Sequence, residues 1–228
     1  MAAIVIGNYL YIDGGELAQY VDGQVEISPR KSMKTGIFPT EKLALTHILQ
    51  ENDTLSIDLR SSWTCDNVTF NAITKNAPVL NDVALWANNE RTSFYQWGGE
   101  RSMMMDHSAT PVPVNRLWRF DTDGQGAGSW KARSIPSGYL RASNALYASG
   151  NGSGYLLGGY ISYRTDPLLA SQEDMPSIPG LVSYDMTADT WSNDTSCIDG
   201  SCYRLNGYLA FFPSFGSNGI LVALGGCA

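Results

Sequence analysis

The chain has 228 residues, of which 43% are hydrophobic, 11% aromatic and 16% charged, and it contains 23 glycines. This length allows one large or two small domains, and the glycine and aromatic content favours a many-stranded β protein over a helical one. A formal net charge of −7 argues against nucleic acid or an anionic membrane as the main partner. No apolar run reaches the roughly 18–20 residues that span a bilayer.

One pattern recurs four times along the chain. In each unit a turn sequence separates two apolar runs, and a pair of glycines closes the second run, which predicts a β-hairpin. The predicted hairpins span Ile4–Ile12, Val83–Trp97, Ala145–Leu157 and Leu209–Leu224. The pairs are Gly14-Gly15, Gly98-Gly99, Gly158-Gly159 and Gly225-Gly226. Because glycine adopts positive φ and lets backbones approach closely, each pair is expected to end a strand sharply.

In three units a third apolar run ending in Asp, and then a Trp, follow the glycines. The third strands are predicted near Thr54–Leu59, Arg116–Asp121 and Leu181–Asp185, and the tryptophans are Trp63, Trp130 and Trp191. We expect the Asp to bond the backbone of its own turn. We expect the Trp to mark the fourth strand and to fill the space between neighbouring sheets. Four antiparallel strands per repeat is the pattern of a β-propeller blade, with units at about 1–65, 82–132, 145–193 and 207–228.

Residues 24–50 lengthen the first unit and differ from it in composition. They include four of the 15 basic residues and a helix-like stretch at 40–49. Two interpretations stay open. The segment is either a surface loop that carries a short helix or sequence foreign to the blade, such as untranslated sequence included by a mistaken gene model.

With double glycine, apolar-Asp and Trp in register, the chain resembles the kelch-repeat family, particularly the kelch proteins of filamentous fungi. The similarity covers nearly the whole chain outside 24–50, in phrases such as Gly7-Asn-Tyr-Leu-Tyr-Ile-Asp-Gly-Gly15. It implies an all-β, kelch-type β-propeller with the galactose-oxidase-like propeller fold. Because such rings generally close with six or seven blades, we expect an incomplete propeller of about three to four blades, a fragment or truncated gene product. Open blade edges would then favour self-association.

Glycosylation motifs and cysteines favour a secretory origin. Four sequons are candidates for glycosylation: Asn52, Asn67, Asn151 and Asn193. Cys197 and Cys202 flank a turn sequence and are candidates for a disulfide, favoured over a zinc site. The pairing of Cys65 and Cys227 stays open. The N-terminus shows no signal-peptide pattern, whereas the resemblance implies that the full-length protein is extracellular or membrane-anchored.

No catalytic constellation stands out, and neither a cofactor nor a metal is expected. The two histidines, His47 and His107, lie outside any pattern that would form the copper site of galactose oxidase. Asp121-x-Asp123-Gly resembles a calcium loop but lacks further carboxylates, so a turn is the favoured interpretation. Met103–Met105 and nearby Trp118 are interpreted as a loop anchor in preference to an adaptable binding surface.

Four arginines lie after glycine pairs or near strand starts, where propeller loops face one side: Arg101, Arg116, Arg141 and Arg164. A structural or solvated role is favoured for each over recognition of an acidic or carbohydrate ligand. The leading hypothesis is a non-catalytic scaffold that binds an unknown protein or glycan through its loops, with no nucleic-acid partner and no membrane span. The alternative is a fragment of a galactose-oxidase-like or other sugar-active enzyme whose catalytic blades are missing.

Overall fold

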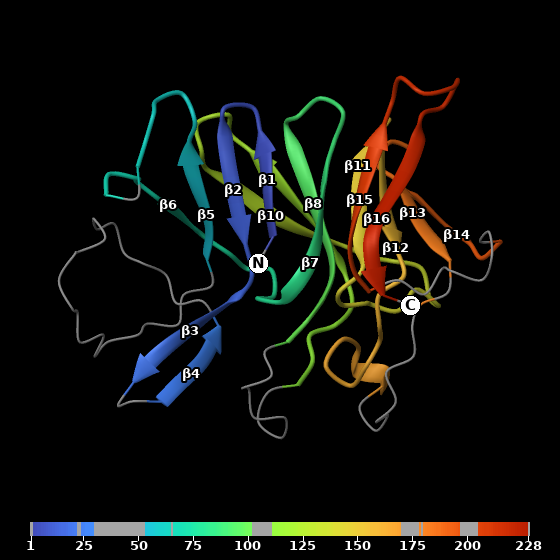
Figure 1. Cartoon of the computed structure of the whole chain (residues 1–228), viewed down its shortest axis with the longest axis horizontal. Helices are drawn as coiled ribbons and strands as arrows, with labels where there is room; N and C mark the ends of the chain where they lie inside the picture. Colours follow the sequence, from blue (N-terminus) through green and yellow to red (C-terminus); the bar gives the residue numbers. More distant parts are fainter. Residues whose placement is uncertain are drawn as a thin grey trace.

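The computed structural model describes residues 2–21, 24–29, 53–64, 66–101, 111–169, 178, 180–196 and 205–227. Within these ranges the regular elements are β-strands, apart from one short 3-10 helix, η1 (Pro167–Leu169). The strands form three four-stranded antiparallel sheets and two two-stranded sheets. The sheets built from the sequence repeat stand side by side with their strands roughly aligned (Figure 1). The fold is therefore all-β and propeller-like, as expected.

We number the sheets of the repeat as blades 1 to 4. Blade 1 contains, in spatial order, β1 (Ala2–Ile6), β2 (Tyr9–Asp13), β5 (Asp53–Asp58) and β6 (Asn71–Thr74). Blade 2 contains β7 (Asn81–Ala87), β8 (Ser93–Glu100), β9 (Leu117–Thr122) and β10 (Gly128–Arg133). Blade 3 contains β11 (Leu146–Gly150), β12 (Ser153–Leu157), β13 (Leu181–Asp185) and β14 (Thr190–Asp194). Blade 4 is the hairpin of β15 (Leu205–Phe212) and β16 (Ile220–Cys227).

The first strands of successive blades face one another. β1 contacts β7, β7 contacts β11, and β11 contacts β15. The first two strands of each blade are antiparallel neighbours, and the blades are aligned so that the connecting turns gather at one end of the molecule, which we call the hairpin-turn end (Figure 1). The glycine pairs lie at the opposite, glycine-pair end.

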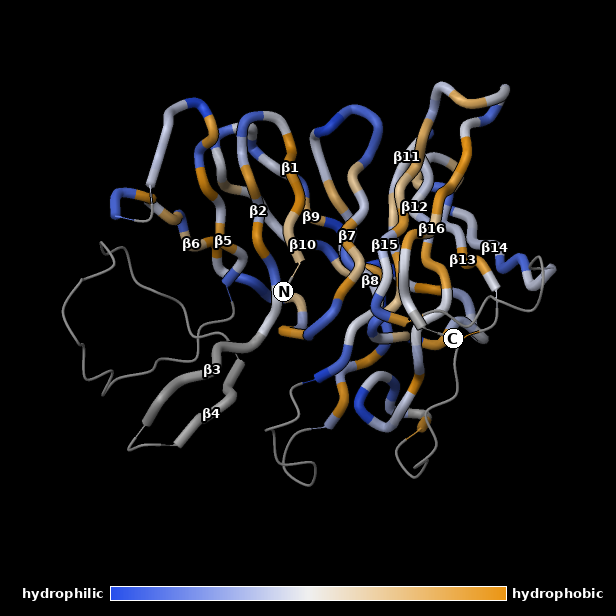
Figure 2. Tube along the Cα trace, viewed as in Figure 1, coloured by the Kyte–Doolittle hydropathy of each residue, from blue (hydrophilic) through white to orange (hydrophobic). Residues whose placement is uncertain are grey.

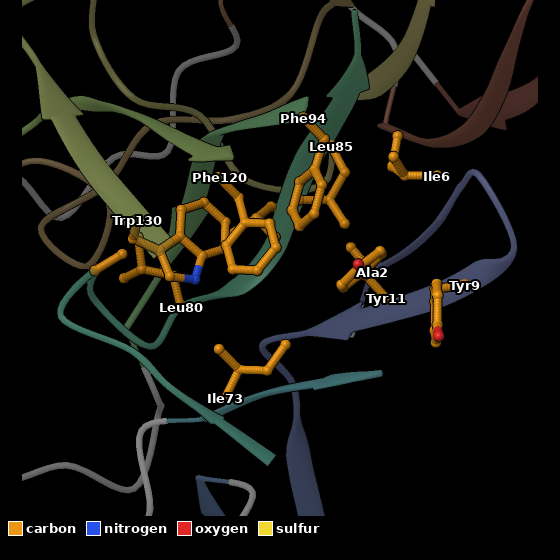
Figure 3. Close-up of a cluster of buried hydrophobic side chains, with 12 residues drawn as sticks. Ala2, Ile6, Tyr9, Tyr11, Ile73, Leu80, Leu85, Phe94, Phe120 and Trp130 are labelled. Atoms are coloured by element: carbon orange, nitrogen blue, oxygen red, sulfur yellow. The ribbon is translucent and has the colours of Figure 1, made fainter. Parts of the chain in front are cut away.

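Aromatic side chains fill the space between blades. Between blades 1 and 2, the Tyr11 ring lies 5.4 Å from the rings of both Phe94 and Phe120 (Figure 3). Between blades 2 and 3, Trp86 is fully buried, and a Cβ added at Gly154 of β12 would overlap its ring. Each fully buried aromatic of this kind contributes roughly 1.5–3 kcal/mol of burial free energy, so these layers dominate the adhesion between blades.

All eight residues of the glycine pairs have positive φ, between 64° and 93°. At Gly99 a Cβ would clash with the Asn81 carbonyl and lie 2.7 Å from Val83 Cγ1. The Gly99 amide donates a 2.6 Å hydrogen bond to the carbonyl of Ala142, which precedes blade 3. The second glycine of this pair therefore ties the end of β8 to the entry of the next blade.

Trp130 and Trp191 lie between blades, whereas Trp63 does not. Trp130 is 5% exposed and its Nε1 donates a 2.9 Å hydrogen bond to Thr54 Oγ1 of blade 1. The Trp191 ring lies 4.9 Å from that of Trp97. Trp63, expected to fill the same position in blade 1, is 45% exposed in the loop before β6. The fourth strand of blade 1 begins only at Asn71, after this longer loop, beyond the unit boundary at about residue 65.

The Asp residues that follow the third strands cap their turns in two blades. Asp58 Oδ1 accepts the backbone amide two residues later at 2.9 Å, and Asp185 Oδ1 accepts the amides two and three residues later at 2.9 and 2.8 Å. In blade 2 Asp121 instead pairs with Lys131 Nζ at 2.8 Å. The turn there is held by Asp123, whose Oδ1 accepts two backbone amides at 2.8 and 2.9 Å. The sequence Asp121-x-Asp123-Gly is thus a strand-connecting turn.

A hairpin outside the blades starts before the atypical segment 24–50 of the first unit and includes its first residues. β3 (Glu16–Val21) and β4 (Gln24–Pro29) pair with each other directly after Gly15. The helix expected at 40–49 lies outside the described residues.

Candidate functional site

The described part of the chain contains no group of three or more His, Cys, Asp and Glu side chains that could hold a metal. In the same part, no helix is long and apolar enough to cross a membrane. Several predicted features fall outside the described residues: Asn52, His47, His107, Met103–Met105 and the cysteines Cys65, Cys197 and Cys202.

The glycine-pair end contains a buried polar cluster. Glu100, directly after Gly99, pairs with Arg164 at 3.0 Å, and the two side chains are 7% and 10% exposed. The Tyr160 hydroxyl donates to Glu100 Oε2 at 2.8 Å. Burial, and then this hydrogen bond to a carboxylate, raise the pKa of Tyr160 to about 12. A buried charge is costly unless it is paired, so Glu100 of blade 2 and Arg164 of the loop after β12 stabilise each other and hold the two segments together.

Three of the four arginines singled out from the sequence are buried. Arg141 is 2% exposed, donates through Nε to the Thr165 carbonyl, and donates through Nη2 to the Pro113 carbonyl at 2.8 Å. Burial lowers the pKa of its guanidinium to about 10. Arg101 is 5% exposed and Arg164 belongs to the Glu100 cluster. These three side chains hold loops together.

Arg116 is exposed and lines a surface hollow at the glycine-pair end. The hollow has a volume of about 410 Å³ and lies between the loop after β6 and the loop before β9. Trp118 and Val114 contribute apolar surface, and Val114 is 64% exposed. Lys75 also lines this hollow, but its ammonium group is bonded to the buried Asp13 and Gln96 side chains, so Arg116 is the exposed cation of the lining.

The hairpin-turn end, in contrast, is organised by hydrogen bonds from blade to blade. Arg91 Nη1 in the turn of blade 2 donates to the Val5 carbonyl of blade 1 at 3.0 Å. The Gly152 amide of blade 3 donates to Asn89 Oδ1 of blade 2 at 2.7 Å. Asn151 Nδ2 of blade 3 donates to the Asn218 carbonyl of blade 4 at 3.2 Å. These bonds join the end of β1 and the turns of blades 2, 3 and 4 into one row, which we call the turn surface.

The turn of blade 2 is rigidly built. Asn88 Oδ1 accepts the backbone amides of Thr92 and Ser93 at 3.0 and 2.9 Å, and its Nδ2 donates to Glu90 at 2.8 Å. Arg91 has a φ of 54°, a conformation that non-glycine residues rarely adopt. Such a conformation persists where the surroundings impose it, and it often marks a functional position. The network therefore presents the Arg91 side chain in a defined place.

Two hollows flank Arg91 on the turn surface. One, of about 270 Å³, lies between blades 1 and 2 and includes Asn8, Tyr9 and Thr122 in its lining. The other, of about 320 Å³, extends to blade 4. Its lining includes Asn89, Ser149 and Phe211, the last of which is half-buried. Side-chain amides, hydroxyls, a cation and aromatic carbon in the same lining can orient a polar ligand that also has apolar surface.

Arg91, Asn88 and Asn89 are not among the site residues expected from sequence. They lie between the two apolar runs of the predicted hairpin Val83–Trp97, where a polar turn is expected on local grounds alone. The signal that distinguishes this turn is contact with residues of other blades, more than 60 positions away. Of the sequons, Asn67, Asn151 and Asn193 are exposed, but Asn151 Nδ2 is engaged in the turn surface.

The fold and the turn surface define a propeller-like all-β protein with a polar end surface. No protein-family model matches the chain, and no curated protein matches it either. Among solved structures the chain is similar to YjhT, with a TM-score of 0.54 and 13% sequence identity. The similarity covers 92% of this chain and 55% of that one, so the chain spans about half the length of YjhT. At this identity the likeness concerns the fold alone.

Proposed function

We propose that the chain is part of a non-catalytic, kelch-type β-propeller whose turn surface binds an extracellular glycan or protein. The kelch assignment is supported by the glycine pairs, which all have positive φ, and by Trp130 and Trp191, which lie between blades. The binding role is supported chiefly by the hydrogen-bonded turn surface with a hollow on each side of Arg91. A preorganised surface binds at a smaller entropic cost than mobile loops do.

The lining of the turn surface favours a glycan with an acidic group. Amides and hydroxyls match sugar hydroxyls, and the half-buried Phe211, which stacks on Tyr155, adds apolar surface to the lining. Arg91 has five N–H donors, of which the bond to Val5 uses one, so further donors can pair with a carboxylate. Asp123 in the smaller hollow already accepts two backbone amides.

A glycan-binding screen followed by calorimetry tests this function. The informative variant is Arg91→Gly, because glycine accepts the positive φ of this position while the whole side chain, with its guanidinium and its bond to the Val5 carbonyl, is removed. We expect it to weaken binding of an acidic glycan at least tenfold, whereas Arg116→Ala at the opposite end leaves binding unchanged. Failure to bind any glycan, or equal binding by Arg91→Gly, would refute this ligand class. Chemical turnover of a bound sugar would instead support the sugar-active enzyme.

We further propose a secreted or membrane-anchored location for the full-length protein. Asn67 and Asn193, both in sequons, are exposed. Expression through a eukaryotic secretory pathway should attach glycans at these two positions, detectable by mass spectrometry after enzymatic deglycosylation. Absence of both modifications in secreted protein would contradict the proposal.

A further inference from the structure

The hairpin of blade 4 has two apolar faces, and only one of them is covered. On the covered face, the Phe211 ring stacks on Tyr155 of blade 3 at 6.0 Å between centroids and an angle of 16°. The other face carries four large apolar side chains that are 42–80% exposed: Tyr208, Phe212, Ile220 and Leu224. They are cross-strand partners, Tyr208 with Leu224 and Phe212 with Ile220, and form one patch, which we call the trailing face. Figure 2 shows the hydrophobic colouring along β16.

In the other blades the corresponding face is covered by the blade that follows. The third residue before each glycine pair is Tyr in blades 1 to 3, and each ring contacts the next blade. Tyr11 lies 5.4 Å from Phe94, and Tyr95 lies 5.5 Å from Tyr184. The residue before the glycine pair points to the same side, because side chains alternate along a strand. That residue is 1% exposed in blade 2, where it is Trp97, but in blade 4 it is Leu224, which is 56% exposed.

Blade 1 presents the opposite half of this contact. Along β1 exposure alternates, with Ala2 and Ile6 buried and Ala3 and Val5 exposed, so Ala3 and Val5 face away from blade 2. With Leu10 of β2, the register partner of Val5, they form the leading face. In blade 2 the residue equivalent to Leu10 is Phe94, which is fully buried against blade 1.

We propose that two copies of this chain associate head to tail, with the trailing face of each on the leading face of the other. The chain makes this type of contact between its own successive blades, so the two faces have matching chemistry. Exposed apolar patches of this kind mark interaction sites. Each copy carries one face of each kind, so two copies can cover both faces of each other. Two identical contacts related by a two-fold axis then close a ring.

This association does not depend on the ligand proposed for the turn surface. Sedimentation equilibrium and light scattering on the 228-residue chain should give a mass of twice the monomer at micromolar concentration. Leu224→Asp on the trailing face and Val5→Asp on the leading face should each weaken dimerisation at least tenfold. Val114→Asp is the matched control, because Val114 is 64% exposed and lies on neither face, and it should leave the dimer intact.

Mixing the two single variants provides the sharpest test. Each homodimer would contain two damaged contacts, but a heterodimer of Leu224→Asp with Val5→Asp retains one intact contact. The mixture should therefore associate more tightly than either variant alone. A monomeric wild-type chain at all concentrations would overturn the proposal. A mass that grows beyond the dimer with concentration would overturn the closed ring, because it indicates open head-to-tail growth. Near-ultraviolet circular dichroism of each variant verifies its fold.

Discussion

Loss of the ammonium group of Lys75 should destabilise the protein more than the loss of any charged group on its surface does. Lys75 and Asp13 form an ion pair between side chains that are 1% and 0% exposed. Lys75 Nζ also donates to Gln96 Oε1 at 3.1 Å and lies 5.1 Å from the Trp130 ring centroid. Replacement by Met keeps most of the apolar stem but leaves the Asp13 carboxylate buried and facing one remaining donor, Thr54 Oγ1, at 2.7 Å. Breaking a buried pair in this way costs about 3–5 kcal/mol.

This cost should be visible in urea denaturation followed by tryptophan fluorescence. For a chain of this size, it corresponds to a fall in melting temperature of about 6–20 °C. The double variant Asp13→Asn/Lys75→Met removes the orphaned charge and keeps an oxygen for Thr54, so it should recover at least half of the loss. The control Arg60→Met breaks the exposed pair with Asp58 and should leave the midpoint unchanged. A loss below about 1 kcal/mol for Lys75→Met alone would refute the reasoning.

Three further predictions concern backbone strain and buried hydroxyls. Gly99→Ala should cost about 2–5 kcal/mol in urea denaturation, because a left-handed residue meets Asn81 and Val83 there. Gly225→Ala has the same sign of φ but open space, so it should cost only about 1–2 kcal/mol; equal costs would contradict the close-contact argument. Tyr11→Phe should be neutral or stabilise by about 1 kcal/mol, since the buried Tyr11 hydroxyl has no hydrogen-bond partner among the described residues, and a clear loss would contradict this. The raised pKa of Tyr160 favours its neutral form in the folded state, so its contribution to stability is complete below pH 10 and is lost towards about pH 12. Tyr160→Phe should therefore flatten the decline of the urea midpoint over this window, and an unchanged decline would assign it to other groups.

The hairpins could be predicted from sequence because their signals are local. A turn sequence, flanking apolar runs and a glycine pair lie within 18 residues in each unit, and the structure forms β-hairpins in all four places. The fourth strand of blade 1 could not be predicted, because a Trp in a loop resembles a Trp that begins a strand. In blade 2 Trp130 pairs with Phe120 of the third strand. The register of β5 and β6, extended by one pair, gives this position in blade 1 to Phe70.

The candidate site could not be predicted for a related reason. Its defining bonds join residues that lie 63 to 86 positions apart, such as Asn89 with Gly152 and Arg91 with Val5. The Asp13–Lys75 pair likewise spans 62 positions. Periodicity reports on one strand or one turn, whereas these contacts depend on the angle between whole blades. Among the four arginines chosen by sequence position, the structure leaves only Arg116 on the surface.

The contact of Trp86 with Gly154 implies that the blades have a fixed order. Trp86 is the register partner of Tyr95, and Ile4 holds the equivalent place opposite Tyr11 in blade 1. A copy of blade 3 placed directly after blade 1 would set the empty space of Gly154 against an isoleucine and leave a void. A second copy of blade 2 placed after itself would set Phe94 against Trp86, with no room for both rings. Duplication or exchange of blades, in evolution or by design, therefore requires compensating changes in side-chain volume on the two blades that meet.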